Sequence, residues 1–221
     1  MTIQKAHAWW AWAANSSVPY LGRVDDDTYV HLPNLEATLR PLHCHAHLVY
    51  GMLAYVGYNP QTFRKCGFSW GGTGAWRKYG CGAAGAHMAS LFPAGMLQVL
   101  SRPVALQVAS SREINAFVAR ATKLLELRAW DRTEDVALGF WVQQLLADGI
   151  LANVSFVRAS NRQAHNLGCQ KRNAMYHPPT PLSVAVHYVK KPSGMAYIHS
   201  LYGEHSATYH PKACTRAAGV A

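Results

Sequence analysis

Three consecutive aspartates follow an apolar segment near the start of the sequence. Asp25, Asp26 and Asp27 come directly after residues 18–24, a stretch that predicts a buried strand. Adjacent carboxylates repel one another and stay ionised together only where a cation or solvent relieves the repulsion. Hard divalent cations bind carboxylate and phosphate oxygens. The triplet therefore favours a metal site, and the alternative is a solvated acidic turn that caps the next helix.

A second acidic pair stands at the expected start of a helix. Thr133 is a good N-cap residue, and Glu134 and Asp135 would fill the first helical turn. Acidic side chains stabilise that turn because they offset the helix macrodipole. A carboxylate at a helix start beside a cleft can also act as a general base. Both interpretations of Asp135 stay open at the level of the sequence.

Histidines provide two further candidates. His187 lies in residues 181–189, where apolar and polar side chains alternate as in a strand. A single histidine in a strand is more often a hydrogen-bonded core residue than a ligand, so both roles stay open. Four possible zinc ligands lie close together in the sequence: His43, Cys44, His45 and His47. No second cluster of ligands is placed to complete a tetrahedral site, so we do not predict zinc there.

The elements that must position these residues alternate between strands and helices. Residues 57–95 are rich in glycine, show no periodicity and predict a long irregular binding loop. Its aromatic side chains could stack on a sugar or a base, or anchor the loop: Phe68, Trp70, Trp76 and Tyr79. Elsewhere we expect strands at 18–24, 48–56, 150–157 and 181–189, and helices that begin near Pro33, Arg102 and Glu134. This order predicts an α/β fold.

Composition narrows the class of protein. Half of the 221 residues are apolar and 14% are charged, which excludes a disordered or coiled-coil protein. The net charge of +10 suits an anionic ligand, but the basic residues are scattered and do not choose between a nucleotide, a lipid surface and a nucleic acid. No segment approaches the roughly 18 apolar residues of a membrane span. Five cysteines allow at most two internal disulfides, and the N-x-S sequons at Asn15 and Asn153 suit a secretory lumen.

The order of the motifs resembles glycosyltransferase family 31, which contains β-1,3-galactosyltransferases, N-acetylglucosaminyltransferases and the fringe enzymes. Residues 25–30 resemble the D-x-D segment of that family, and residues 92–101 resemble its donor loop ending in Val-Leu-Ser. Residues 134–139 resemble its Glu-Asp-Val box, and residues 186–190 resemble its terminal histidine strand. The ordered set, spread over residues 5–195, is far more specific than any one motif.

This resemblance implies a GT-A-like mixed sheet flanked by helices, incomplete at the N-terminus, as one partial catalytic domain over residues 1–221. It implies inverting transfer of galactose or N-acetylglucosamine from a UDP-sugar to a hydroxyl of a glycan or glycoprotein. Mn²⁺ or another divalent cation would assist. The implied residues are Asp25, Asp27 and His187 for the metal, Asp135 as the catalytic base, and Asp25, Asp26 and Gly95 for the donor.

The family places a nucleotide-binding half and a membrane anchor before the D-x-D strand, whereas 24 residues precede Asp25 here. We therefore expect this chain to be part of a longer protein of the Golgi lumen or membrane, attached only through an anchor that this chain lacks. The motif order argues against a nucleic-acid partner. One alternative stays open, a remnant that binds a sugar or nucleotide without turning it over.

Overall fold

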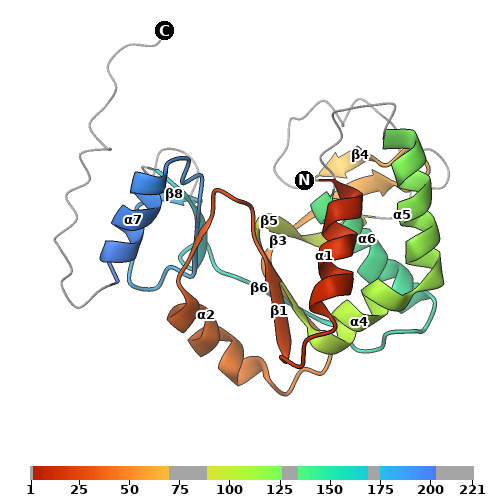
Figure 1. The fold of residues 1–221 in the computed structure, drawn as a ribbon, viewed down its shortest axis with the longest axis horizontal. Helices are drawn as coiled ribbons and strands as arrows, with labels where there is room; N and C mark the ends of the chain where they lie inside the picture. The colour runs from red at the N-terminus through yellow and green to blue at the C-terminus, as the bar shows by residue number, and fades with distance from the viewer. Residues whose placement is uncertain (1, 70–88, 126–133, 169–174, 203–221) are drawn as a thin grey trace, which may run out of the picture. The chain divides into compact units, whose positions relative to one another are not determined.

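The chain forms two compact units in the computed structural model, which describes residues 2–69, 89–125, 134–168 and 175–202 (Figure 1). The first unit comprises Met1–Arg23 and Cys44–Arg158, and the second comprises Val24–His43 and Ala159–Ala221. Each unit contains a mixed sheet with helices beside it. The predicted α/β class is therefore confirmed, while a single catalytic domain over residues 1–221 stays a prediction.

A five-stranded sheet organises the described part of the first unit. Four of its strands pair with one another in antiparallel fashion, in the order β1 (Tyr20–Arg23), β5 (Ala89–Ser101), β3 (Leu48–Asn59) and β4 (Arg64–Ser69). The strand β6 (Ser155–Arg158) pairs with β3 in parallel and makes the sheet mixed. The strands predicted at 18–24 and 48–56 correspond to β1 and β3 and are confirmed.

Four helices accompany this sheet in the described residues: α1 (Ile3–Ala13), α4 (Arg102–Ser110), α5 (Arg112–Leu125) and α6 (Glu134–Ala147). Helix α4 begins after its N-cap Ser101 with a proline in its first turn, as the sequence predicts. Helix α6 begins at Glu134, as predicted, while its expected cap Thr133 lies outside the described residues. No helix in the described ranges combines the length and the apolar character that a bilayer span requires.

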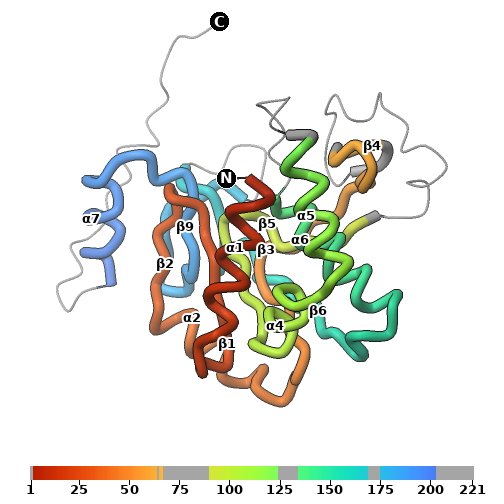
Figure 2. The backbone as a smooth tube through the Cα atoms, turned by 45° about the vertical axis from the view of Figure 1, so that its right-hand side comes forward, coloured from red at the N-terminus to blue at the C-terminus, as the bar shows by residue number. Residues whose placement is uncertain are grey.

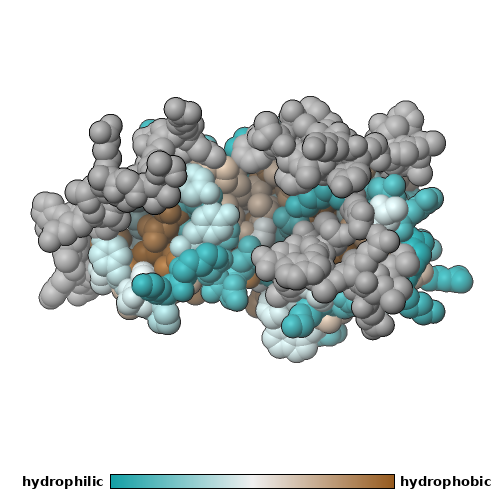
Figure 3. Space-filling model, turned by 90° about the horizontal axis from the view of Figure 1, so that it is seen from above, coloured by the Kyte–Doolittle hydropathy of each residue, from teal (hydrophilic) through white to brown (hydrophobic). Residues whose placement is uncertain are grey.

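The core of the first unit is aromatic and lies where α1, α4, α5 and α6 pack on one another and on the sheet (Figure 2). Trp10 and Trp141 are completely buried, and Phe117 contacts both Phe140 and Trp141 through its ring. The space-filling view in Figure 3 shows hydrophobic side chains recessed among hydrophilic ones in the described residues. Burial of these large rings stabilises this unit.

A close helix–sheet contact in this core depends on Gly139 of α6. A Cβ atom at this position would lie 2.5 Å from the backbone oxygen of Leu91 and 2.5 Å from Cβ of Phe92 in β5. We expect Gly139→Ala to lower the free energy of unfolding by about 1–3 kcal/mol, because neither atom can move away without shifting the strand. Urea unfolding measures the change. The control Gly22→Ala, whose nearest contact would be 3.8 Å away, should change stability by less than about 0.5 kcal/mol.

The second unit contains a smaller mixed sheet, with strand order β2 (Tyr29–Val30), β9 (Ala185–His187), β7 (Ala164–Leu167) and β8 (Tyr176–His177). Strand β9 is antiparallel to β2 and parallel to β7, which in turn is parallel to β8. Its helices are α2 (Leu32–Leu39), the short 3₁₀ helix η1 (Arg40–Leu42) and α7 (Pro192–Ser200), of which α7 packs beside β2. The helix predicted near Pro33 is α2 and is confirmed.

Three expectations differ from the structure. The predicted irregular loop over 57–95 is wrong in part, because β4 and the second half of the β3–β5 ladder occupy its ends, while residues 70–88 lie outside the described residues. The strand predicted at 150–157 begins only at Ser155. The strand predicted at 181–189 is limited to Ala185–His187. Its predicted alternation is wrong because Ala185 and Val186, which point to opposite faces of the sheet, are both fully buried.

Candidate functional site

The aspartate triplet lies in a tight turn of the second unit. The backbone N–H of Thr28 donates to the carbonyl of Asp25 at 3.1 Å, closing a turn in which aspartate is favoured at the first position. The chain then enters β2 at Tyr29. The N-cap of α2 is His31, which makes no side-chain cap bond, so the triplet does not cap this helix. The alternative interpretation as a helix cap is therefore wrong.

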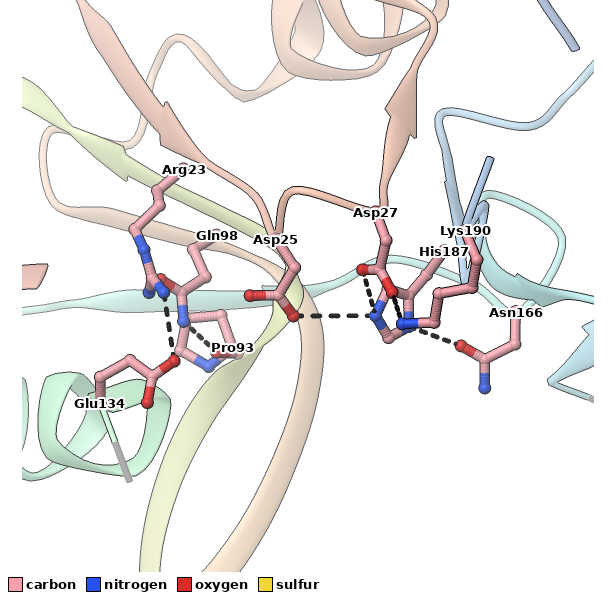
Figure 4. Close-up of polar contacts among 9 residues, drawn as sticks. All are labelled: Arg23, Asp25, Asp27, Pro93, Gln98, Glu134, Asn166, His187 and Lys190. Carbon is pink, nitrogen blue, oxygen red and sulfur yellow. Dashed lines mark hydrogen bonds and ion pairs between the residues drawn. The ribbon is translucent and has the colours of Figure 1, made fainter. Parts of the chain in front are cut away.

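Sheet register brings this turn to His187. Tyr29 pairs with Val186 in the antiparallel ladder, so the residues before Tyr29 run alongside the residues after Val186. The backbone N–H of Val189 donates to the carbonyl of Asp27 at 2.9 Å and extends this pairing beyond the strands. Asp25, Asp27 and His187 consequently face one another, as Figure 4 shows.

The three side chains form the candidate metal site. Nε2 of His187 lies 3.1 Å from Oδ1 of Asp27 and 3.7 Å from Oδ2 of Asp25. One ligand atom from each residue lies within 4.8 Å of the other two, and this is the only such group of three among the described histidines, cysteines and acidic residues. The side chains of Asp27 and His187 are each 13% exposed, and that of Asp25 is 33% exposed. Two carboxylates and an imidazole are ligands that suit Mn²⁺ and similar cations.

Asn166 orients the histidine and was not singled out by the sequence. It lies opposite His187 in the parallel ladder between β7 and β9, and its Oδ1 accepts a hydrogen bond from Nδ1 of His187 at 2.8 Å. This bond puts the proton of a neutral ring on Nδ1 and leaves the Nε2 lone pair directed at the carboxylates. A lone pair facing two anions is unfavourable unless a cation or a second proton lies between them.

The electrostatics of the cluster favour the neutral ring. Burial, the largest influence, lowers the pKa of His187 and outweighs the neighbouring Asp27 and Asp25, which raise it. Burial raises the pKa of Asp27, but the hydrogen bond and the charge of Lys190, together with the attraction of His187 when that ring is protonated, hold it below its usual range. An ionised Asp27 beside a neutral His187 is a donor set ready for a cation.

Asp26 does not join the cluster. Its side chain is exposed, in contrast to Asp25 and Asp27 on either side of it. Its predicted part in donor binding stays a prediction.

The other predicted residues belong to the first unit and are described by their own surroundings. Asp135 is half-buried in the first turn of α6, where its Oδ1 accepts from the N–H of Val136 at 2.8 Å. Gly95 is buried in β5. It lies between Pro93 and Gln98, where the pairing of β5 with β3 shifts register. A bulge of this kind interrupts strand pairing at the segment that resembles the donor loop.

A buried polar network lies next to each of these segments in the first unit (Figure 4). Arg23, the last residue of β1, donates to Oε1 of Gln98 at 2.7 Å and forms an ion pair with Glu134 at 3.3 Å. Gln98 in turn donates to the carbonyl of Pro93 at 2.8 Å, across the bulge that contains Gly95. The network joins the strand before Asp25, the bulge in β5 and the start of the helix that carries Asp135.

Lys190 was also missed as a site residue, although it ends the segment 186–190 that resembles the terminal histidine strand. Its Nζ forms an ion pair with Oδ2 of Asp27. Between it and His187, Tyr188 has a φ of +65°, a left-handed conformation that is rare for a large residue and concentrates at functional sites. The spacing of three residues from His187 was the only available signal.

The pKa of another histidine in this sheet, His165, predicts how the stability of the fold depends on pH. His165 is fully buried, bonds to Oγ of Ser183 at 2.8 Å and stacks on His177. Burial and then the charge of His177 lower the pKa of His165 to about 4, from an unfolded value of 6.5. The unfolded chain therefore binds more protons between these values, and stability falls as pH decreases through this window.

We expect the free energy of unfolding to fall by up to about 1.4 kcal/mol per pH unit below pH ~6.5. Urea unfolding between pH 7 and 5 measures this slope before most carboxylates titrate. His165→Gln should flatten the slope in that interval, even if it lowers stability at every pH. An unchanged slope in the variant would contradict this origin.

The remaining candidates do not form a site in the described residues. The histidines of the 43–47 group bond separately, His43 and His47 to backbone carbonyls and His45 to Ser155. Trp70, Trp76 and Tyr79 lie outside the described residues, and Phe68 lies in β4. A cavity of about 750 Å³ in the second unit contains none of the predicted site residues and is lined by Asn161, Arg162, His177, Pro178, Thr180, Pro181 and Leu182.

Comparison with protein-family models and with curated proteins found no match to this chain.

Proposed function

We propose that this chain is the part of an inverting glycosyltransferase that binds the diphosphate of a UDP-sugar through a divalent cation, most simply Mn²⁺, and transfers galactose or N-acetylglucosamine to a hydroxyl of a glycan or glycoprotein. The observation that carries the proposal is the convergence of Asp25, Asp27 and Nε2 of His187 within 4.8 Å. Asn166 supports it by holding His187 in the tautomer that a metal ligand needs.

The roles of the residues follow from their chemistry. Asp25, Asp27 and His187 would hold the cation, which when bound supplies positive charge that stabilises the leaving UDP. Asp135 would accept the proton of the acceptor hydroxyl as its oxygen attacks the anomeric carbon and the bond to UDP breaks. Asp26 and the bulge at Gly95 would contact the donor, where a glycine lets the backbone approach closely.

The mixed sheets flanked by helices are compatible with a GT-A-like fold. Two features support a lumenal compartment such as the Golgi, because Cys66 is disulfide-bonded and both sequon asparagines, Asn15 and Asn153, are exposed. The proposed acceptor, a hydroxyl of a glycan or glycoprotein, comes from the resemblance to family 31.

Calorimetric titration of the chain with MnCl₂, and then with UDP in saturating Mn²⁺, tests the proposal. We expect Asp27→Asn to weaken Mn²⁺ binding by more than about 100-fold, and Asn166→Ala, which frees the His187 ring, to weaken it by about 10- to 100-fold. The matched control Glu36→Gln removes an acid that is 75% exposed on α2 and should leave Mn²⁺ binding unchanged.

UDP binding should require Mn²⁺ in the unchanged chain. Failure to bind Mn²⁺, or equal binding by Asp27→Asn, would contradict the proposed function. Mn²⁺-dependent UDP binding without any sugar transfer would instead support the non-catalytic remnant.

A further inference from the structure

The side-chain ammonium of Lys190 lies against the candidate metal site. Nζ of Lys190 pairs with Oδ2 of Asp27, while Nε2 of His187 faces Oδ1 of the same carboxylate at 3.1 Å. A lysine side chain is charged at neutral pH, so Lys190 places a positive charge beside Asp27. The carboxylate that a divalent cation would need is thus engaged on one oxygen by an amine.

The backbone after β9 places the lysine there. Tyr188, with its φ of +65°, turns the chain so that His187 and Lys190 both reach Asp27. Buried Val189 anchors the turn through its N–H bond to the carbonyl of Asp27 and through packing with Val186 and Ile198. Nζ of Lys190 also lies 5.1 Å from the centre of the Tyr188 ring, within the range of a cation–π contact.

Lys190 can nevertheless leave Asp27 at little cost. Its side chain is 68% exposed, against 13% for Asp27, and an exposed ion pair with a flexible lysine contributes little free energy. A divalent cation between Asp25, Asp27 and His187 would repel the ammonium and compete for the same carboxylate. The displaced ammonium remains tethered three residues from His187, where phosphate oxygens held by that cation would offer it a new anionic partner beside Asp26.

We infer that Lys190 is a resident counter-ion of Asp27 that gives way to the divalent cation and then binds the diphosphate of the donor. This inference rests on the proposed function and adds a residue to its site. It makes the lysine act in opposite directions on two ligands: it opposes binding of the metal alone and favours binding of the metal-bound diphosphate.

The opposite signs provide the test. In calorimetric titrations of the full chain at pH 7.5, we expect Lys190→Met to bind Mn²⁺ roughly three- to tenfold more tightly, because a competing charge is gone. The same variant should bind UDP about tenfold more weakly in saturating Mn²⁺, because a charge-assisted bond to phosphate is lost. Lys190→Arg, which keeps the charge, should retain UDP binding within about threefold.

The control is Lys191→Met, which removes the same charge from the adjacent exposed residue and should change neither affinity. Unchanged affinities in Lys190→Met, or a change of both in the same direction, would overturn the inference and leave the proposed function standing. Absence of Mn²⁺ binding by the unchanged chain would overturn both.

Discussion

Replacing Asp135 with asparagine is expected to slow sugar transfer by about 10²- to 10⁴-fold, the usual contribution of a general base. The amide cannot accept the proton of the acceptor hydroxyl, although it nearly preserves the shape of the side chain. Mn²⁺ and UDP affinities should stay within about threefold, because the metal ligands are other residues. Initial rates of UDP release from UDP-galactose and UDP-N-acetylglucosamine, with acceptor present, measure the change.

The matched control for this variant is Asp148→Asn, beyond the other end of α6. Asp148 is exposed and accepts a hydrogen bond from Gln144 at 2.8 Å. It should leave turnover unchanged. Turnover that survives in Asp135→Asn would mean that Asp135 serves only the helix start, where its loss costs about 0.3–1 kcal/mol of stability.

Among the proposed stability variants, truncation of Arg23 is expected to lower the free energy of unfolding most. Arg23→Ala should lower the free energy of unfolding by about 3–5 kcal/mol, because it removes one member of a buried ion pair with Glu134. Arg23 is 5% exposed and Glu134 is 8% exposed, so water cannot replace the missing charge without opening the core. Urea unfolding followed by tryptophan fluorescence measures the difference.

Two further variants separate burial of charge from loss of contacts. The double variant Arg23→Met/Glu134→Leu removes both charges together and should recover most of the loss. Arg40→Ala removes an exposed pair with Glu36, with side chains 76% and 75% exposed, and should change stability by less than about 0.5 kcal/mol. If Arg23→Ala lowered stability no more than Arg40→Ala, the buried Arg23–Glu134 pair would not stabilise the fold.

Sequence patterns predicted the elements that local signals define. Ser101 with Pro103 marks the start of α4, and Glu134 marks the start of α6, because capping and first-turn preferences act within a few residues. Strand β5 was missed because Pro93 and Gly95 oppose strand propensity. Its pairing with β3 is a long-range contact that outweighs local preference: Pro93 pairs with Leu53, and the bulge that follows accommodates Gly95.

The residues of the site divide in the same way into those that local sequence patterns indicate and those that only the folded sheet brings together. The aspartate triplet indicated a metal site, His187 was a separate candidate, and the resemblance to family 31 assigned Asp25, Asp27 and His187 to one site. Asn166 and Lys190 could not be found in this way. The position of Asn166 depends on the register of β7 against β9, and that of Lys190 depends on the left-handed turn at Tyr188. Both are properties of the folded sheet that no local pattern encodes.

The central claim is that a cation bound by Asp25, Asp27 and His187 enables transfer from a UDP-sugar. The most direct measurement is the rate of UDP release from UDP-galactose and UDP-N-acetylglucosamine, with acceptor, in Mn²⁺ and in EDTA. It should be made on the unchanged chain and on Asp27→Asn. We predict release that requires Mn²⁺ and is lost in Asp27→Asn. Release that is equal in EDTA, equal in Asp27→Asn, or absent with both donors would contradict the claim.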